Sequence, residues 1–138
     1  MTTTTTTVEE AVEEIVAALE PLTSEIPGLQ VTAGANPFPT PPSIDVFPGD
    51  PFLAEAGFNR WKAFFTVRAR VSTVDTQAGQ RLLWRLLDPH DPASVIAALA
   101  DTVGFENDNP IAGYREYVED SVQNGRLLGS EWRVSVFL

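Results

Sequence analysis

The sequence predicts a single α+β domain in which helices pack on a mostly antiparallel sheet. The segment Trp61–Ser72 alternates between apolar and mostly polar residues, as a strand with one buried face does. Segments with helical periodicity lie before and after it in the chain. The 138 residues, none of them cysteine, are enough to bury a core without disulfide bonds or thiolate-bound metal.

The chain is expected to form one domain that follows a short arm. Residues 1–7 are expected to be a flexible threonine-rich arm, and residues 8–138 the domain, with a proline- and phenylalanine-rich loop at 37–60. A hydrophobic share of 43% and a charged share of 20% are ordinary for a globular protein. Neither a secretory signal nor a membrane span is expected, because no apolar run approaches the roughly 18 residues that a span needs.

The first third of the chain is expected to hold one helix and two short strands. Thr7 is placed to cap a helix over Val8–Glu20, where apolar residues recur at helical spacing. A strand is expected at Leu29–Thr32. Residues 37–51 hold six of the eleven prolines, so this stretch is expected to be neither a helix nor a central strand. Within it, Ser43–Phe47 is expected to be a short or edge strand.

Two helices are expected after the long strand. The first runs from Asp75, its N-cap, to about Leu87, and contains Gly79, which a close packing contact would explain. Its buried residues are expected to be Ala78, Leu82, Leu83, Leu86 and Leu87. The second is expected over Pro92–Thr102, with Asp91 as its N-cap and proline in the first helical position.

Two strands are expected to complete the sheet. They cover Tyr114–Val122 and Leu127–Leu138, and Asn124-Gly125 marks the hairpin turn between them. Residues 104–113 before them are expected to be a loop. The predicted order of elements is therefore α-β-β-β-α-α-β-β.

The charges are distributed unevenly along the chain. The net charge is −10, and residues 1–59 hold nine acidic residues and no basic one, because Arg60 is the first cation. Residues 60–138 hold ten acidic and nine basic residues. A protein that binds nucleic acid needs clustered lysine and arginine, so specific DNA binding is not expected. The acidic portion also repels anionic membranes.

Catalysis is not expected from this sequence, and neither is a cofactor. His90 is the one histidine, and Asp88 and Asp91 beside it could orient its imidazole for proton transfer. The preferred interpretation is a turn between helices in which the aspartates cap and the histidine is solvated. General-base catalysis would also need a pocket and a positioned partner.

No metal site is expected either. Two groups of oxygen ligands miss the spacing of known sites: a loop group of Glu106, Asp108 and Asn109, and a helix group of Glu9, Glu10, Glu13 and Glu14. The loop group does not fit the twelve-residue calcium loop. The helix group lacks the Glu-x-x-His of a di-metal carboxylate site, so a solvated helix face explains it better.

Six residues are candidates for contact with other proteins: Phe38, Phe47, Phe52, Phe58, Arg68 and Arg70. The phenylalanines are spread along the proline-rich loop and either plug the core or form an apolar docking patch. The arginines lie on the long strand and either face solvent or pair with acidic residues of a neighbouring subunit. The sequence leaves both alternatives open.

Four segments together resemble a known family. They are Pro42–Asp45, Ser72–Leu83, Leu87–Pro89 with Ser94–Leu99, and Leu128–Trp132. In this order they resemble the tail terminator proteins of long-tailed, siphovirus-type actinobacterial bacteriophages. The resemblance covers about residues 8–138 and departs from the family pattern at 37–60 and 104–110.

The resemblance implies a virion structural protein of α+β fold at the head–tail junction, assembled in the host cytoplasm. Its expected partners are further copies of itself in a hexameric ring, the major tail tube protein and a head-completion or stopper protein. DNA would pass through the lumen without specific binding, and no membrane is involved. The alternatives are another neck or head-completion protein, a non-virion binding module that uses residues 37–58, and a small enzyme that acts through His90.

Overall fold

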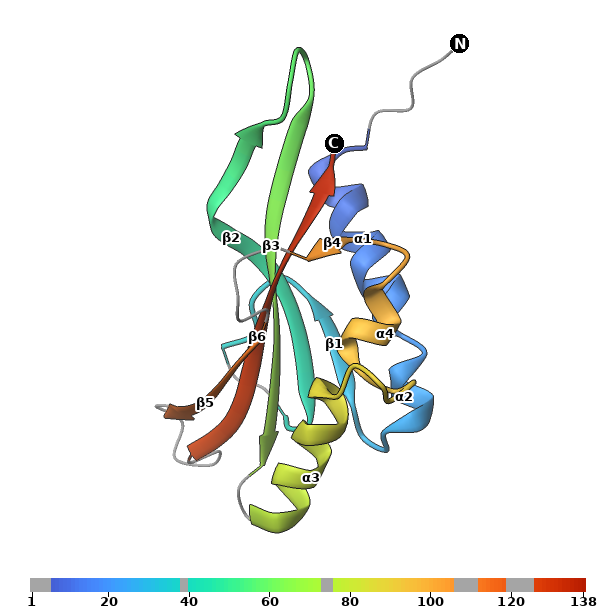
Figure 1. Ribbon diagram of the computed structural model, residues 1–138. Coiled ribbons are helices and arrows are strands. Elements are labelled where there is room, and N and C mark those ends of the chain that lie inside the picture. Colours follow the sequence, from blue (N-terminus) through green and yellow to red (C-terminus); the bar gives the residue numbers. More distant parts are fainter. Residues whose placement is uncertain (1–5, 38–39, 73–75, 106–111, 119–125) are drawn as a thin grey trace.

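The computed structural model describes residues 6–37, 40–72, 76–105, 112–118 and 126–138, and they form one α+β domain (Figure 1). In chain order the elements are α1 (Val8–Leu19), α2 (Leu22–Glu25), β1 (Gln30–Ala33), β2 (Ser43–Glu55), β3 (Trp61–Ser72), α3 (Thr76–Leu87), α4 (Val95–Leu99), β4 (Gly104–Phe105), β5 (Ala112–Val118) and β6 (Arg126–Phe137). The predicted fold class and the order of the main elements are confirmed. The short helix α2 and the two-residue strand β4 were not predicted.

The strands form one mixed, mostly antiparallel sheet. Its order is β1-β2-β3-β6-β4, and β5 also pairs with β6. Only the pairing of β1 with β2 is parallel among the described strands. The strands β4 and β5 pair with successive stretches of the same edge of β6. The long strand β3 therefore lies in the interior of the sheet, with β2 on one side and β6 on the other.

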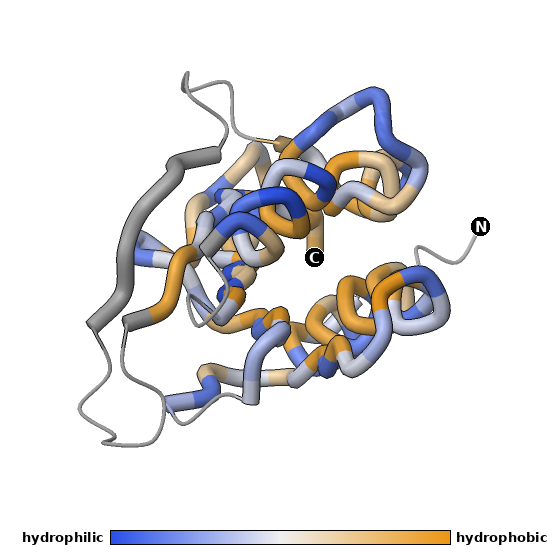
Figure 2. The backbone as a smooth tube through the Cα atoms, turned by 90° about the horizontal axis from the view of Figure 1, so that it is seen from below, coloured by the Kyte–Doolittle hydropathy of each residue, from blue (hydrophilic) through white to orange (hydrophobic). Residues whose placement is uncertain are grey.

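The helices cover one face of this sheet, and the core lies between the two layers (Figure 1). The alternation predicted for β3 is confirmed over most of its length, because Ala63, Phe65, Val67, Ala69 and Val71 are all buried. The core is completed by buried apolar residues of α1 (Ala11, Ile15, Leu19), α4 (Val95, Leu99) and β6 (Trp132, Val134). Figure 2 shows hydrophobic and hydrophilic residues interleaved along α1, as an amphipathic helix requires.

The cap of α1 is confirmed. Thr7 Oγ1 accepts a hydrogen bond from the backbone N–H of Glu10 at 3.2 Å and donates one to the carboxylate of Glu10 at 3.0 Å. Pro21, which follows α1 closely, has helical φ and ψ and lies at the N-cap of α2. Proline suits the start of a helix because its missing N–H has no partner there in any case.

The start of the helix predicted over Pro92–Thr102 was wrong. The helix α4 begins at Val95, and Ser94 caps it by accepting a hydrogen bond from the N–H of Ala97 at 3.1 Å. Asp91 instead accepts from the N–H of Ala93 at 2.8 Å, which closes a turn before the helix. Aspartate and serine side chains both accept hydrogen bonds readily from nearby backbone N–H groups. Asp91 and Ser94 are therefore both suitable caps, and the helix begins after Ser94.

The prediction that Ser43–Phe47 is a short or edge strand, and that residues 37–51 hold no central strand, was also wrong. The strand β2 has 13 residues and its beginning is central, and the reason lies in where the prolines fall. Residues Ser43 to Val46 of β2 pair with β1 on one side and with β3 on the other, so this part of the strand is interior. No proline lies in it. Pro48 and Pro51 lie beyond the end of β1, where β2 is an edge and the register with β3 shifts. Proline is tolerated at such edges and bulges.

Gly79 makes the close contact that would explain a glycine inside α3. A Cβ added at this position would lie 2.3 Å from the backbone oxygen of Ser72 and 3.7 Å from Cγ2 of Val71. The helix therefore touches the end of β3 at this point. Because Gly79 faces the sheet, its neighbour Ala78 is turned to solvent, and the prediction that Ala78 is buried was wrong.

Some predicted features lie outside the described residues. These are the N-cap Asp75, the hairpin turn Asn124-Gly125, the loop residues Glu106, Asp108 and Asn109, and most of the threonine-rich arm. Residues 104–113 were predicted to be a loop, but Gly104–Phe105 is the strand β4 and β5 begins at Ala112.

Candidate interaction surfaces

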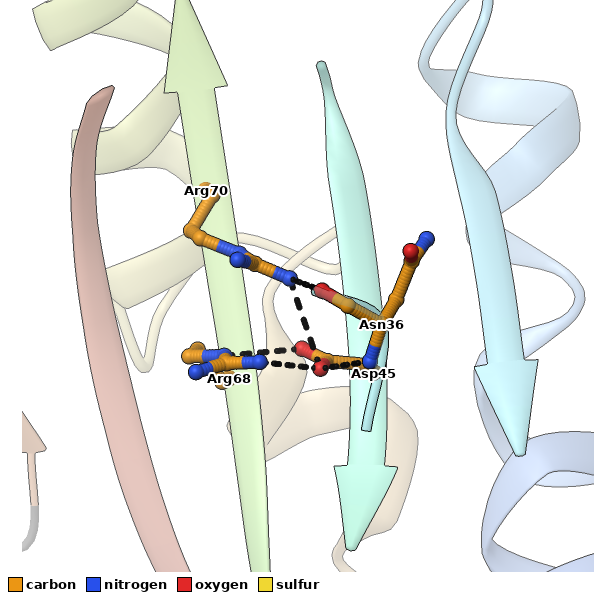
Figure 3. A network of polar contacts seen from close by, with 4 residues as sticks. All are labelled: Asn36, Asp45, Arg68 and Arg70. Atoms are coloured by element: carbon orange, nitrogen blue, oxygen red, sulfur yellow. Dashed lines mark hydrogen bonds and ion pairs between the residues drawn. The ribbon is translucent and has the colours of Figure 1, made fainter. Parts of the chain in front are cut away.

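A network of polar contacts lies on the face of the sheet away from the helices (Figure 3). At its centre is Asp45, a buried carboxylate on β2. Arg68 donates two hydrogen bonds to it, from Nε at 3.1 Å and from Nη2 at 2.6 Å. Arg70 donates a third from Nη2 at 3.4 Å, and the backbone N–H of Asn36 donates a fourth at 2.9 Å.

The sheet register brings these groups together. Asp45 is the cross-strand partner of Arg68, and Arg70 lies two residues further along the same face of β3. Nη2 of Arg70 also donates to the backbone oxygen of Asn36 at 2.6 Å. The network therefore fixes the segment around Asn36 over the sheet. The strongest of its bonds are charge-assisted, which makes them shorter than neutral hydrogen bonds.

This arrangement corrects the alternatives predicted for the two arginines. Both bind a carboxylate of their own chain, and the side chain of Arg70 is only 2% exposed. Arg70 therefore neither faces solvent nor reaches a neighbouring subunit. Arg68 keeps 18% exposure and lies with its guanidinium carbon 4.8 Å from the ring centre of Phe47.

More cations lie on the same outer face of the sheet. The ammonium of Lys62 and the guanidinium of Arg133 lie 5.4 Å and 5.2 Å from the ring centre of Phe64. We call Lys62, Arg68 and Arg133 the cationic face. The carboxylates of Asp45 and Glu131 lie on the same side of β2 and β6, so this face carries acidic groups as well as the three cations.

The opposite side of the domain is acidic. The helix α1 turns its buried residues to the sheet and exposes Glu9, Glu10, Glu13 and Glu14, and Glu20 follows at its end. We call these five glutamates the acidic face. Among the described residues, the acidic face therefore lies in the helical layer, whereas the cationic face lies on the other side of the sheet.

A hairpin formed by the ends of β2 and β3 projects beyond the rest of the sheet (Figure 1). Its turn is ordered by backbone hydrogen bonds from Ala56 N to Arg60 O at 2.8 Å and from Arg60 N to Gly57 O at 3.2 Å. Phe58 lies in this turn and is 91% exposed. The neighbouring large apolar residues Leu53, Trp61 and Phe137 are about half exposed. We call Phe58, Leu53, Trp61 and Phe137 the hairpin tip.

The candidate phenylalanines have different surroundings, and burial in the core applies to only some of them. The ring of Phe52 meets that of Phe65 edge-on, with centroids 5.5 Å apart, and packs against the core. Phe47 is half-buried under Arg68. Phe58 is exposed, and Phe38 lies outside the described residues.

The helical side has a pocket that the sequence did not predict. Its volume is about 290 Å³, and it lies between α1, α2 and the turn before α4. It is lined by Ala18, Pro21, Leu22, Glu25, Pro92, Ala93 and Ala98. Small residues on three separate elements leave this space, and only their arrangement in the fold brings them together. A more open groove of about 450 Å³ lies beside it, between α1 and the end of α4.

His90 lies in an exposed turn, where its backbone N–H donates to Asp88 Oδ1 at 2.9 Å. Across the five described stretches, no group of three or more histidine or acidic side chains is placed to hold a metal ion. In the same stretches, no helix is long and apolar enough to cross a membrane. A comparison of the chain with protein-family models finds no match, and a comparison with curated proteins finds none either.

Proposed function

We propose that this chain is a tail terminator of a long-tailed bacteriophage. In this role it forms a ring, expected to be hexameric, on the head-proximal end of the tail tube and joins the tube to a head-completion protein. The observation that carries the proposal is the separation of the acidic face from the cationic face on one small domain. A closed ring needs two different surfaces on each copy that complement each other on the next copy.

The charges fit such a head-to-tail contact. The acidic face has five exposed glutamates and belongs to the helical layer, whereas the cationic face belongs to the bare side of the sheet. Two copies that meet through identical surfaces would bring like charges together, which costs free energy. Two copies that meet head to tail bring opposite charges together.

The segments that resemble the family also lie close to one another in the fold. Pro42–Asp45 runs into the start of β2 and Leu128–Trp132 belongs to β6, and their strand residues pair with Val67–Val71 of β3. The segment Ser72–Leu83 continues from that end of β3 into α3. The resemblance therefore supports the proposal through one connected part of the structure, and the projecting hairpin belongs to the region that departs from the family.

The net charge of −10 supports a channel through which DNA passes without binding. A lumen with excess negative charge repels the phosphate backbone at any sequence.

The test is binding of the purified chain to isolated tail tubes that lack a terminator. The expected result is a sixfold ring at one end of each tube, seen by electron microscopy, and recovery of the ability of the tubes to join filled heads. Binding should weaken as salt concentration rises, because exposed charges are screened. A matched pair of variants uses Glu13→Lys with Glu14→Lys in the acidic face, which should weaken ring formation, and Asp50→Lys, an exposed acid outside the acidic face, the hairpin turn and the pocket, which should not.

Two results would contradict the proposal. Binding to filled heads but not to tail tubes would identify a stopper or other head-completion protein instead. Absence of the chain from purified virions would leave only a function outside the particle.

A further inference from the structure

The hairpin tip presents Phe58 in a way that points to a binding partner. The turn is closed by two backbone hydrogen bonds, and Gly57 and Asn59 take the positive φ angles of 127° and 54° that it needs. The exposed aromatic ring therefore lies on a rigid support. Ordering the tip on binding would cost little, and aromatic residues of this kind dominate the free energy of many protein interfaces.

The pocket between α1, α2 and α4 has the size to accept this side chain. A cavity of about 150 Å³ is known to hold benzene, so a pocket of this size accommodates a phenyl ring. Its volume is about 290 Å³, and most of its lining residues are apolar. The turn between β2 and β3 and the helix α2 lie toward opposite ends of the domain (Figure 1), and α2 lines the pocket, so the tip does not reach the pocket of its own chain.

Each place has one exposed residue whose charge is opposite to that at the other. Arg60 lies two residues after Phe58, is exposed, and has its guanidinium carbon 4.9 Å from the ring centre of Phe137. Glu25 lines the pocket, and its side chain is 61% exposed although its carboxylate lies 3.6 Å from Arg85. Opposite charges at the rim of a contact fix its orientation and speed association.

We infer that the hairpin tip of one copy binds the pocket of a second copy, with Phe58 inserted between α1, α2 and α4 and Arg60 facing Glu25. The inference rests on the proposed function, for which it supplies the contact between neighbouring subunits of the ring. Because the two surfaces differ, each copy uses its tip on one neighbour and its pocket on another, and the chain of contacts closes into a ring or continues as a filament.

Self-association measured by sedimentation velocity, over protein concentrations up to millimolar, tests the inference. The variant Phe58→Ala should weaken association about 30-fold, which at 1.4 kcal/mol per tenfold is about 2 kcal/mol and typical of an interface hot spot. The matched control is Trp84→Ala. Trp84 is also a large aromatic residue, 56% exposed on α3 outside the tip and the pocket, so its removal should leave association unchanged.

A charge exchange tests which surface the tip meets. Arg60→Glu and Glu25→Arg should each weaken association about two- to fivefold, and the double variant should recover most of the loss. Recovery is expected only where the two residues face each other across the contact. Losses that simply add in the double variant would overturn the assignment of the pocket.

Other outcomes separate this inference from the proposed function. If the wild-type chain and the Phe58→Ala variant formed rings on tail tubes equally well, the inference would be overturned and the proposed function would stand. If Phe58→Ala abolished binding to the tubes but left self-association intact, the partner of the tip would be the tube protein. A wild-type chain that stayed monomeric in solution and on tail tubes would overturn both.

Discussion

Replacing Asp45 by alanine should destabilise the domain more than most single substitutions. The carboxylate accepts hydrogen bonds from two arginines and from the backbone of Asn36, and it is buried. Without it, the side chain of Arg70, which is only 2% exposed, would lose a carboxylate that now lies 3.4 Å from its Nη2. Removing a carboxylate from a buried guanidinium is costly because water cannot replace the lost interaction.

The size of the effect follows from the two arginines. Removing one partner of a buried ion pair typically costs about 3–5 kcal/mol. Here the lower end applies, because the side chain of Arg68 is already 18% exposed and can turn to solvent. A loss of about 3 kcal/mol is a large part of the roughly 5–15 kcal/mol that stabilises a domain. It corresponds to a melting temperature lower by about 10 °C for a chain of this length.

Urea denaturation followed by circular dichroism measures this loss. With a denaturant dependence of about 2 kcal/mol per molar urea, the midpoint should fall by about 1.5 M. The matched control is Glu55→Ala, an exposed acid on the same strand, which should change stability by less than about 0.5 kcal/mol. The difference between the two variants should persist at high salt, since buried pairs are screened little. A loss below about 1 kcal/mol for Asp45→Ala would refute the argument that the network carries buried charge.

Three further predictions concern local structure. Gly79→Ala should lower stability by about 1–2 kcal/mol, because the clash with the backbone of Ser72 outweighs the helical preference for alanine. Its control, Gln77→Ala in the same helix, should be neutral or stabilising, and a more stable Gly79→Ala protein would show that the close contact does not exist. Ser94→Ala should cost about 1 kcal/mol by removing the cap of α4, measured by thermal denaturation. Phe58→Ala should leave the melting temperature unchanged, since the ring is 91% exposed, and a clear decrease would mean that it packs within its own chain.

The periodic elements could be predicted because a single local pattern determines each of them. The strand β3 occupies the predicted residues, Trp61–Ser72, and α1 differs from its prediction by one residue. The start of the long strand departs from its pattern: Trp61 lies on the face that is buried elsewhere, yet is 48% exposed because it belongs to the projecting hairpin. The hydrophobic pattern indicates which face of the sheet a residue lies on, but not how far the layer of helices extends over that face.

The polar network could not be predicted, because it depends on the register between strands. Asp45 and Arg68 are 23 residues apart, and nothing in the local sequence of either residue indicates the other. Before the structure, Arg68 and Arg70 could only be recognised as cations on the mostly polar side of a strand. The pocket was missed for the same reason, since its small residues come from helices that the sequence does not orient.

The two parts of β2 have different surroundings, and together they explain how the domain could present a contact without aggregating. The first part, Ser43–Val46, is held between two strands and carries Asp45, so it anchors the hairpin in the sheet. Among the described strands, the remainder of β2 pairs on one side only, and exposed edges tend to pair with strands of other chains. Pro48 and Pro51 remove donors from that edge, and the shift of register between Pro48 and Leu53 interrupts its regular pairing with β3. Addition of a strand from a partner protein to this edge is therefore disfavoured. The side chains at the end of the hairpin, Phe58 above all, are the groups best placed to bind a partner.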